Sequence, residues 1–312
     1  MKKMIFILGL FIYLNATANT CWENFKRETE TQMQEREYQY QILDKKFSKL
    51  TDLAKAYTQE GPKDELVILL HGFLANPNEV RSIADTVNRA GYPVYSGLIP
   101  GYGATAKVAN YYKKEHWIWW SQQEIARAEK CFSKIHLIGF STGATIFHDY
   151  VSAHPEDKKI QSVVLISSFF QNKTIFDWFL KITRASGIKE AGVSWVFSHL
   201  PVSDVQVIHD HPETYLQRAP VDSMFEVIDL GKMNQKRQLE HKLTVPALGV
   251  VSEEDWVASP TKQKRVLRKN FEDLELITYR RPGHIPHQVM LHEVSQVADQ
   301  VHELVMDFIE RH

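Results

Sequence analysis

The stretch that most constrains the fold is residues 136–148, HLIGFSTGATIFH, because it has the pattern of a strand, a sharp turn and a helix. Ser141 stands at the apex of the turn, between Gly139 and Gly143. Such a turn strains the serine backbone and leaves room only for small neighbours. The serine hydroxyl is then held above the sheet edge, next to helix N–H groups that can stabilise an oxyanion. The pattern predicts a nucleophilic serine.

Further short apolar runs along the chain have the pattern of buried strands. They occupy residues 65–70, 93–95, 163–167, 245–251 and 274–279. Segments of helical periodicity lie between and after them, including one closed by Gly91 and one that carries apolar residues from Val294 to Phe308. This alternation predicts an α/β fold with a mostly parallel central sheet and helices on both faces. In such sheets ligands bind at the carboxyl ends of the strands.

The first eighteen residues have the layout of a secretory signal peptide. Lys2 and Lys3 precede an apolar run, and the small residues 16–18 follow it, which predicts cleavage after Ala18 and export to the periplasm or outside the cell. The apolar run is shorter than the roughly 20 residues of a membrane-spanning helix. An uncleaved N-terminal anchor is the alternative.

The remaining chain divides into an extension and a main domain. Charged residues with apolar ones at helical spacing up to Tyr57 predict a helical extension over residues 19–61, packed on the domain. The main domain is predicted over 62–312. Its residues at about 171–241 are too long and too aromatic for a simple crossover, so they predict a cap subdomain.

Cysteine usage and charge narrow the functional classes. Cys21 and Cys131 are the two cysteines, and the sequence leaves open whether they form a disulfide or remain separate thiols. The chain has 37 Lys and Arg residues and 38 Asp and Glu residues, so its net charge gives no indication of nucleic-acid binding.

A serine nucleophile needs a base, and the base needs an acid that orients it. His284 follows the last predicted strand within Arg-Pro-Gly-His and is the favoured base, with His287 as its rival. The acid is predicted to be Asp255, which follows another strand, while Glu253 and Glu254 are expected to be solvated loop acids.

Two backbone N–H groups are expected to form the oxyanion hole. The N–H of Thr142 begins the helix after the serine, and the N–H of Phe73 lies in the loop after an early strand. His71, in the same loop, is interpreted as a side chain that structures the loop. The chain order Ser141, Asp255, His284 is the order found in α/β-hydrolases.

From residue 65 onward the chain resembles capped α/β-hydrolases, in particular carboxylesterases and monoacylglycerol lipases. The segments that carry the resemblance are LLHGF (69–73), AGYPVYSGLIPGYG (90–103), IGFSTG (138–143), VVSEEDWV (250–257) and PGHIPH (282–287). The resemblance implies that Ser141 is the nucleophile, Asp255 the acid, His284 the base, and Phe73 and Thr142 the oxyanion donors. Tyr102 departs from the histidine usual between the two loop glycines, and Thr142 departs from a bulky apolar residue.

These observations together predict a serine hydrolase that cleaves carboxylic esters through an acyl-enzyme. Its partner is a small ester or lipid, with brief contact at a membrane surface and no nucleic acid. No cofactor and no metal is expected. The alternatives are another hydrolase chemistry, such as that of an aminopeptidase, thioesterase or haloperoxidase, and a non-catalytic binding protein on the same fold.

Overall fold

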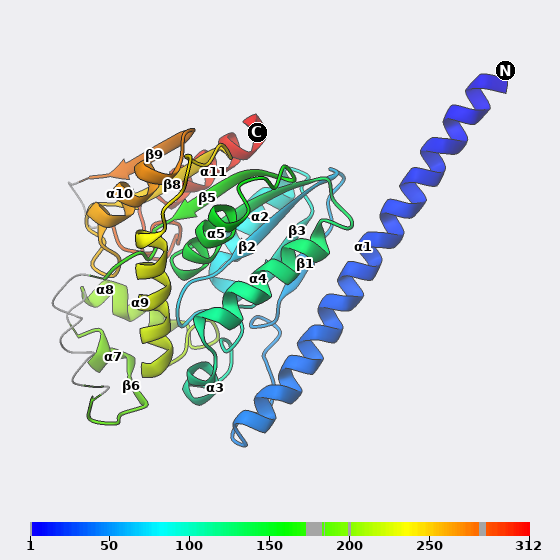
Figure 1. The fold of residues 1–312 in the computed structure, drawn as a ribbon. Helices are drawn as coiled ribbons and strands as arrows, with labels where there is room; N and C mark the ends of the chain where they lie inside the picture. Colours follow the sequence, from blue (N-terminus) through cyan, green and yellow to red (C-terminus); the bar gives the residue numbers. More distant parts are fainter. Residues whose placement is uncertain (1, 173–182, 184, 199–200, 281–284) are drawn as a thin grey trace.

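The apolar runs predicted as strands form one twisted sheet at the centre of the molecule (Figure 1). The computed structural model describes residues 2–172, 183, 185–198, 201–280 and 285–312, and for 2–19 and 202–204 only the backbone. The sheet order is β1-β3-β2-β4-β5-β8-β9. Its parallel strands are β2 (Glu65–Leu70), β3 (Val94–Gly97), β4 (Lys134–Phe140), β5 (Ile160–Ile166), β8 (Ala247–Ser252) and β9 (Leu274–Tyr279). The predicted fold class is confirmed.

The parallel register brings the loops that matter to one edge of the sheet. Leu70 at the end of β2 pairs with Gly139 of β4, and Phe140 pairs with Ile166 at the end of β5. Ile166 in turn pairs with Val250 of β8. The residues that follow β2, β4, β5 and β8 therefore lie side by side, as parallel sheets require.

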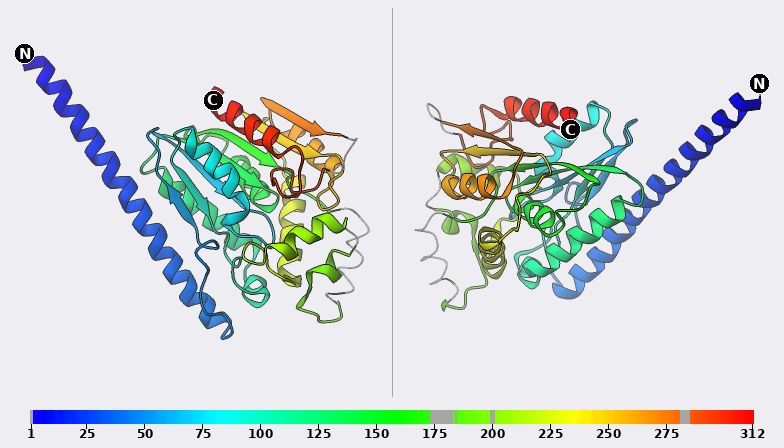
Figure 2. Two further views of the ribbon diagram at one scale, coloured as in Figure 1. Left: turned by 180° about the vertical axis from the view of Figure 1, so that it is seen from behind. Right: turned by 45° about the horizontal axis from the view of Figure 1, so that its top comes forward.

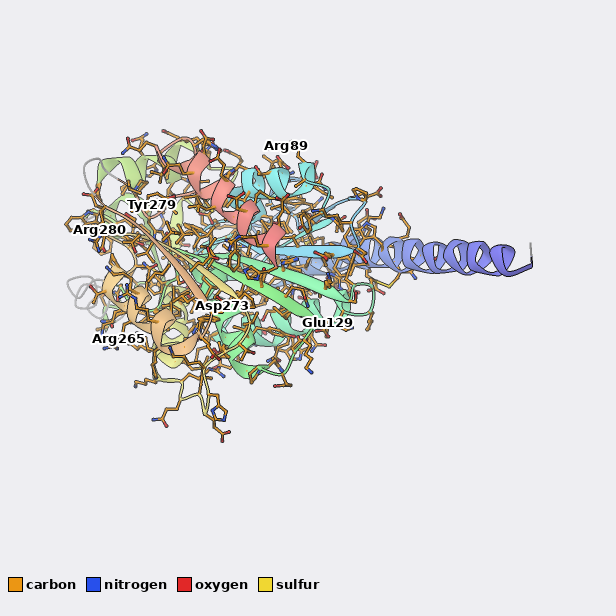
Figure 3. The ribbon with its side chains drawn as sticks, turned by 90° about the horizontal axis from the view of Figure 1, so that it is seen from above. Arg89, Glu129, Arg265, Asp273, Tyr279 and Arg280 are labelled. Atoms are coloured by element: carbon orange, nitrogen blue, oxygen red, sulfur yellow. A yellow bond between two sulfur atoms is a disulfide. The ribbon has the colours of Figure 1, made fainter. Side chains whose placement is uncertain are left out.

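Helices cover both faces of the sheet. On one face lie α2 (Arg81–Arg89) and α11 (Ala298–Arg311), and on the other α4 (Lys114–Ala128) and α5 (Thr142–Ala153), as the front and back views show (Figure 2). Helix α10 (Pro260–Asn270) packs on β8 and β9. Seen from above, Arg89 at the end of α2 and Arg265 on α10 lie on opposite sides of the sheet (Figure 3). Ile83 and Val87 on α2 are buried, which agrees with the helical periodicity predicted for the segment that Gly91 closes.

The N-terminal extension is a helix, but it ends earlier than the periodicity predicts. Helix α1 spans Lys2–Leu43 and lies along the β1 edge of the molecule, with Phe25 and Tyr40 buried (Figure 1). The prediction that the helix continues to Tyr57 is wrong. After Leu43 the backbone N–H of Lys46 bonds to the Asp44 carboxylate, and the chain turns back.

The turned-back segment still buries its apolar residues. Phe47, Leu50 and Ala54 are buried in the core, although the segment that carries them is not helical. Their spacing resembles that of a helix face, but turns and irregular backbone bring them to the core. The segment leads into β1 (Tyr57–Gln59), a short strand that pairs antiparallel with β3 at the sheet edge and that the sequence did not predict. Within the described residues, none of the helices combines the length and the apolar character needed to cross a bilayer.

The residues predicted as a cap form separate helices and strands beside the carboxyl edge of the sheet. These are β6 (Glu190–Gly192), α7 (Val193–Val196), α8 (Val202–Asp210), β7 (Arg218–Pro220) and α9 (Val221–Lys236). Strands β6 and β7 pair with each other, apart from the main sheet. Two further short elements, η1 (Pro77–Val80) and α3 (Ala106–Tyr111), follow β2 and β3. Three aromatic residues of the predicted cap, Phe176, Trp178 and Phe179, lie outside the described residues.

Candidate active site

Ser141 occupies the sharp turn that its sequence predicts. Strand β4 ends at Phe140 and α5 begins at Thr142, and Ser141 between them has a φ of 52° and a ψ of −109°. A positive φ is rare for a residue with a side chain and marks strain of the kind found at functional turns. A Cβ on Gly143 would lie 2.4 Å from the carbonyl oxygen of Leu70, so only glycine fits there. The turn is therefore built around exposure of the Ser141 hydroxyl to the pocket.

A histidine and an aspartate complete a line of hydrogen bonds from Ser141. The Ser141 hydroxyl lies 2.9 Å from Nε2 of His287, and Nδ1 of His287 lies 2.7 Å from Oδ2 of Asp255. With Nδ1–H donating to the carboxylate, Nε2 is free to accept the serine proton. All three side chains are buried. This arrangement can activate the hydroxyl as a nucleophile.

The Asp255 carboxylate is held by its own partners. Its Oδ1 accepts the backbone N–H groups of Val257 and Ala258, each at 2.8 Å, and Oδ2 accepts Nε2 of Gln263 at 3.2 Å. These bonds fix the carboxylate toward His287, as an orienting acid requires. Among the three candidate acids the structure brings Asp255, as predicted, to the histidine.

The neighbouring acids have other partners. Glu253 forms an ion pair with Lys264, and Oε2 of Glu254 accepts the backbone N–H of Ile285 at 3.2 Å. Glu254 is thus more than a solvated loop acid, because it helps to hold the segment that carries the histidine.

The favoured base has to be corrected from His284 to His287. His284 lies outside the described residues, while the hydrogen bonds that a base needs are made by His287. The reason is the distance that the chain must cover after β9, since β8 and β5 stand between β9 and β4. At about 4.8 Å between strands, this is a span of roughly 14 Å.

Two hydrogen bonds mark the path of that crossing. The Ser252 hydroxyl at the end of β8 donates to the carbonyl of Ile285 at 2.6 Å, and the Ser167 hydroxyl after β5 donates to the carbonyl of His287 at 2.8 Å. The chain thus passes β8 at Ile285 and reaches β5 at His287. A residue beyond Ile285 is needed to reach Ser141 after the end of β4. The closeness of His284 to the end of β9 in sequence was therefore a misleading signal.

The two expected oxyanion donors lie on adjacent loops. Thr142 is the first residue of α5, so its N–H has no acceptor within the helix. The N–H of Phe73 takes part in none of the hydrogen bonds recorded among the described residues. The backbone N–H of Gly143 donates to the carbonyl of His71 at 3.1 Å and ties the two loops together. Both donors therefore remain available at the same edge as Ser141.

His71 structures the loop, as the sequence predicts. Its Nδ1 lies 2.8 Å from the carbonyl of Gly72, and its Nε2 accepts the backbone N–H of Ile99 at 3.1 Å. Burial lowers the pKa of His71 to about 3, so the ring is neutral with the proton on Nδ1. It has no path to act as a base at Ser141 while both ring nitrogens are engaged.

An apolar pocket opens in front of Ser141. Cap residues form much of its wall, and the polar side chains of Glu79, Asn172 and Gln288 line it together with Ser141 and His287. The lining residues are Phe73, Leu74, Glu79, Phe140, Ser141, Phe169, Asn172, Phe197, Ile208, Tyr215, Met224, Val227, Ile228, Trp256, Val257, His287 and Gln288. Of the aromatic residues in the predicted cap, Phe197 lines the pocket and Trp195 is half exposed. The cap thus builds the pocket wall as well as its own core.

Tyr102, which departs from the resembled pattern, links the sheet domain to the cap. Its hydroxyl lies 3.1 Å from the hydroxyl of Ser223 on α9, and the ring is buried. The ring also packs nearly perpendicular to the rings of His71 and Phe73. The tyrosine therefore supports the loop that carries an oxyanion donor.

The sheet order, the strained serine turn and the hydrogen-bonded serine, histidine and aspartate define an α/β-hydrolase fold. The chain belongs to the serine aminopeptidase S33 family, whose sequence pattern matches residues 61–289. This confirms the predicted resemblance to capped α/β-hydrolases.

Individual relatives carry the comparison further. The thermostable monoacylglycerol lipase of Bacillus sp. strain H-257 is 22% identical over 249 residues, which cover 78% of this chain and 91% of that protein. The crystal structure of Paleococcus ferrophilus monoacylglycerol lipase superposes with a TM-score of 0.66 at 17% identity, over 84% of this chain and 98% of that one. A soluble variant of monoglyceride lipase from Saccharomyces cerevisiae superposes with a TM-score of 0.65 at 13% identity, over 82% of this chain and 90% of that one. These structures share the fold.

Proposed function

We propose that this protein is a serine hydrolase that cleaves carboxylic esters with an apolar acyl group. The observation that carries the proposal is the hydrogen-bonded line from Ser141 through His287 to Asp255, opening into the apolar pocket. The relatives named as monoacylglycerol lipases make a monoacylglycerol the first lipid substrate to test.

The geometry supports a two-step mechanism. His287 accepts the Ser141 proton through Nε2 while Oγ attacks the ester carbonyl, and the N–H groups of Phe73 and Thr142 stabilise the negative oxygen that forms. His287 then gives the proton to the leaving alcohol. In the second step His287 removes a proton from water as the water attacks the acyl-enzyme. His287 then returns this proton to Oγ of Ser141 as the bond to the acyl group breaks and the acid is released.

The nucleophile and the base can be tested directly. A fluorophosphonate probe should label the wild type and should not label Ser141→Ala. His287→Ala should lower kcat for p-nitrophenyl esters by about 10⁴-fold or more, the range for loss of a triad base. His284→Ala is the matched control, three residues away in the same segment, and should retain activity. Full activity of His287→Ala together with an inactive His284→Ala would reverse the assignment.

The chemistry can be separated from its alternatives by substrate. Esters of short and long acids, a monoacylglycerol, a thioester and an aminoacyl arylamide are compared with one preparation. The apolar pocket predicts that kcat/KM is highest for an ester with an apolar acyl chain. A preference for the aminoacyl arylamide would instead favour the peptidase activity that gives the family its description.

We also propose that the protein is exported. The signal-peptide pattern at residues 1–18 and the disulfide between Cys21 and Cys131 support this, since disulfides persist in oxidising compartments. Cleavage after Ala18 would leave Cys21 on the mature chain. N-terminal sequencing of the protein recovered from outside the cytoplasm should begin at Asn19. An intact Met1 on that protein would favour the uncleaved anchor instead.

A further inference from the structure

Glu79 is a buried acid in the pocket that the proposed mechanism does not use. It lies on η1, and its side chain is almost entirely inaccessible to solvent, although glutamate is rarely buried without a partner. Its Oε2 accepts the backbone N–H of Gly72 at 2.6 Å. The side chain also lines the pocket together with Ser141 and His287. A buried acid beside the catalytic groups needs a physical explanation.

The partner of Glu79 is next to an oxyanion donor. The N–H of Phe73 belongs to the peptide unit that also contains the carbonyl of Gly72, and that carbonyl is held by Nδ1 of His71. Glu79 holds the N–H on the other side of Gly72. Both polar groups of Gly72 are thus engaged by side chains. Since a peptide unit is planar, these two bonds set the direction of the Phe73 N–H.

There is little space for the loop to relax. A Cβ on Gly72 would lie 3.1 Å from the ring of Phe140 and 3.2 Å from Oε2 of Glu79. The loop therefore packs between the residue before Ser141 and the Glu79 carboxyl. Oxyanion stabilisation depends on donors placed in advance, so this close packing bears on catalysis.

The cap is fastened to the same loop. Nδ2 of Asn76 donates to the carbonyl of Glu213 at 2.7 Å, and Nδ2 of Asn78 donates to the hydroxyl of Thr214 at 2.7 Å. The backbone N–H of residue 216 donates to the carbonyl of residue 74 at 2.9 Å. Between these bonds, Tyr215 is buried and lines the same pocket as Glu79. Cap residues 213–216 thus contact segment 74–78, which leads into Glu79.

We propose that Glu79 is a positioning residue for the oxyanion hole, and that cap residues 213–216 hold it and its loop in place. This inference rests on the proposed esterase function. It follows that a change in the cap at Thr214 reaches the Phe73 N–H through the loop, without any contact with the substrate.

The test compares two substitutions at Glu79. Glu79→Gln keeps an oxygen that can accept the Gly72 N–H, while Glu79→Met keeps the size of the side chain and removes the acceptor. For an ester substrate, kcat of Glu79→Met should fall by about 10²–10³-fold, as when one oxyanion donor is lost, with KM little changed. Glu79→Gln should retain kcat within about fivefold of the wild type, because the hydrogen bond to Gly72 survives.

A second measurement separates positioning from general damage. A boronic acid that binds Ser141 as a tetrahedral adduct should lose affinity in Glu79→Met in parallel with kcat/KM. Wild-type kinetics in Glu79→Met would overturn the proposal. So would equal damage in both variants, because charge and not hydrogen-bond acceptance would then be needed. A rise in KM at constant kcat would place Glu79 in substrate binding instead.

The role of the cap is tested by variants that leave Glu79 unchanged. This test therefore remains informative if Glu79→Met fails to fold. Thr214→Val removes the hydroxyl that accepts Asn78 and should lower kcat by about 3- to 10-fold, the range for one neutral hydrogen bond. Ser194→Ala, which removes a cap hydroxyl bonded to His209, is the control and should leave kcat unchanged. An unchanged kcat in Thr214→Val would overturn the coupling. A wild type that neither hydrolyses esters nor reacts with the fluorophosphonate would instead remove the proposed function itself.

Discussion

Replacing Glu79 by glutamine should change how the stability of the protein depends on pH. Burial raises the pKa of Glu79 from 4.5 to about 7, although the Gly72 N–H, the Tyr215 hydroxyl and His287 each favour its charged form. Each tenfold change in proton affinity corresponds to about 1.4 kcal/mol, so the rise amounts to about 3 kcal/mol. The amide of Glu79→Gln does not titrate in this range.

The direction of the change in stability with pH depends on whether the folded or the unfolded protein keeps the proton of Glu79. Below pH 4.5 the carboxyl is protonated in both states, and the site adds no pH dependence. Between about pH 4.5 and 7 the unfolded chain ionises while the folded chain keeps its proton, so stability falls as pH rises. Above about pH 7 both are ionised, and the full cost of the buried charge remains. The free energy of unfolding of Glu79→Gln, minus that of the wild type, should therefore rise by about 3 kcal/mol across this window.

The assay is urea unfolding followed by tryptophan fluorescence at several pH values, with the disulfide intact. The diagnostic quantity is how the difference in free energy of unfolding between Glu79→Gln and the wild type changes with pH. Its value at a single pH is not diagnostic, because the amide forms hydrogen bonds of its own. Glu303→Gln, an exposed substitution on α11, controls for the change of acid to amide. If the curves of the wild type and Glu79→Gln run parallel from about pH 5 to about pH 8, the buried charge carries no such cost and the reasoning is refuted.

Two further predictions concern the framework around the site. The disulfide between Cys21 and Cys131 closes a sequence separation of 110 residues. Replacing both cysteines by serine should lower the free energy of unfolding by about 4 to 5 kcal/mol by the loop-entropy relation, and thermal unfolding checks this against the wild type with the disulfide intact. An unchanged Tm would show that the link does not constrain the unfolded chain. A Cβ on Gly231 of α9 would lie 2.5 Å from the carbonyl oxygen of Phe170, so Gly231→Ala should destabilise the fold by about 1–3 kcal/mol in urea unfolding. Equal stability of this variant would mean that α9 shifts without cost.

Local chemistry explains why much of the fold could be predicted. A strand buried on both faces needs a continuous apolar run, and such runs marked the parallel strands that the structure shows. The turn at Ser141 is equally local, since Gly143 has no room for a side chain. Asp255 was predicted because it lies in the loop that begins directly after β8, at the same sheet edge as Ser141.

Features that depend on distant contacts were missed. The end of α1 at Leu43 follows from the Asp44 turn and from the return of the chain to the sheet edge, although the apolar spacing continues beyond it. Strand β1 is three residues long and exists because β3 offers it an open edge. Neither the end of α1 nor the presence of β1 can be predicted from the residues of the segment alone.

The sequence by itself determined the α/β fold, the nucleophile turn and the acid, because each is encoded in a few consecutive residues and in the strand they follow. Only the tertiary structure decided that His287 serves Ser141, since the histidine is selected by how far the chain travels across β8 and β5. The pocket wall and the link from Glu79 through Gly72 to Phe73 were likewise settled in space. They join residues of the loop after β2, of η1 and of the cap, which are separated along the chain. Burial and hydrogen bonding depend on distance in space and not on separation in sequence.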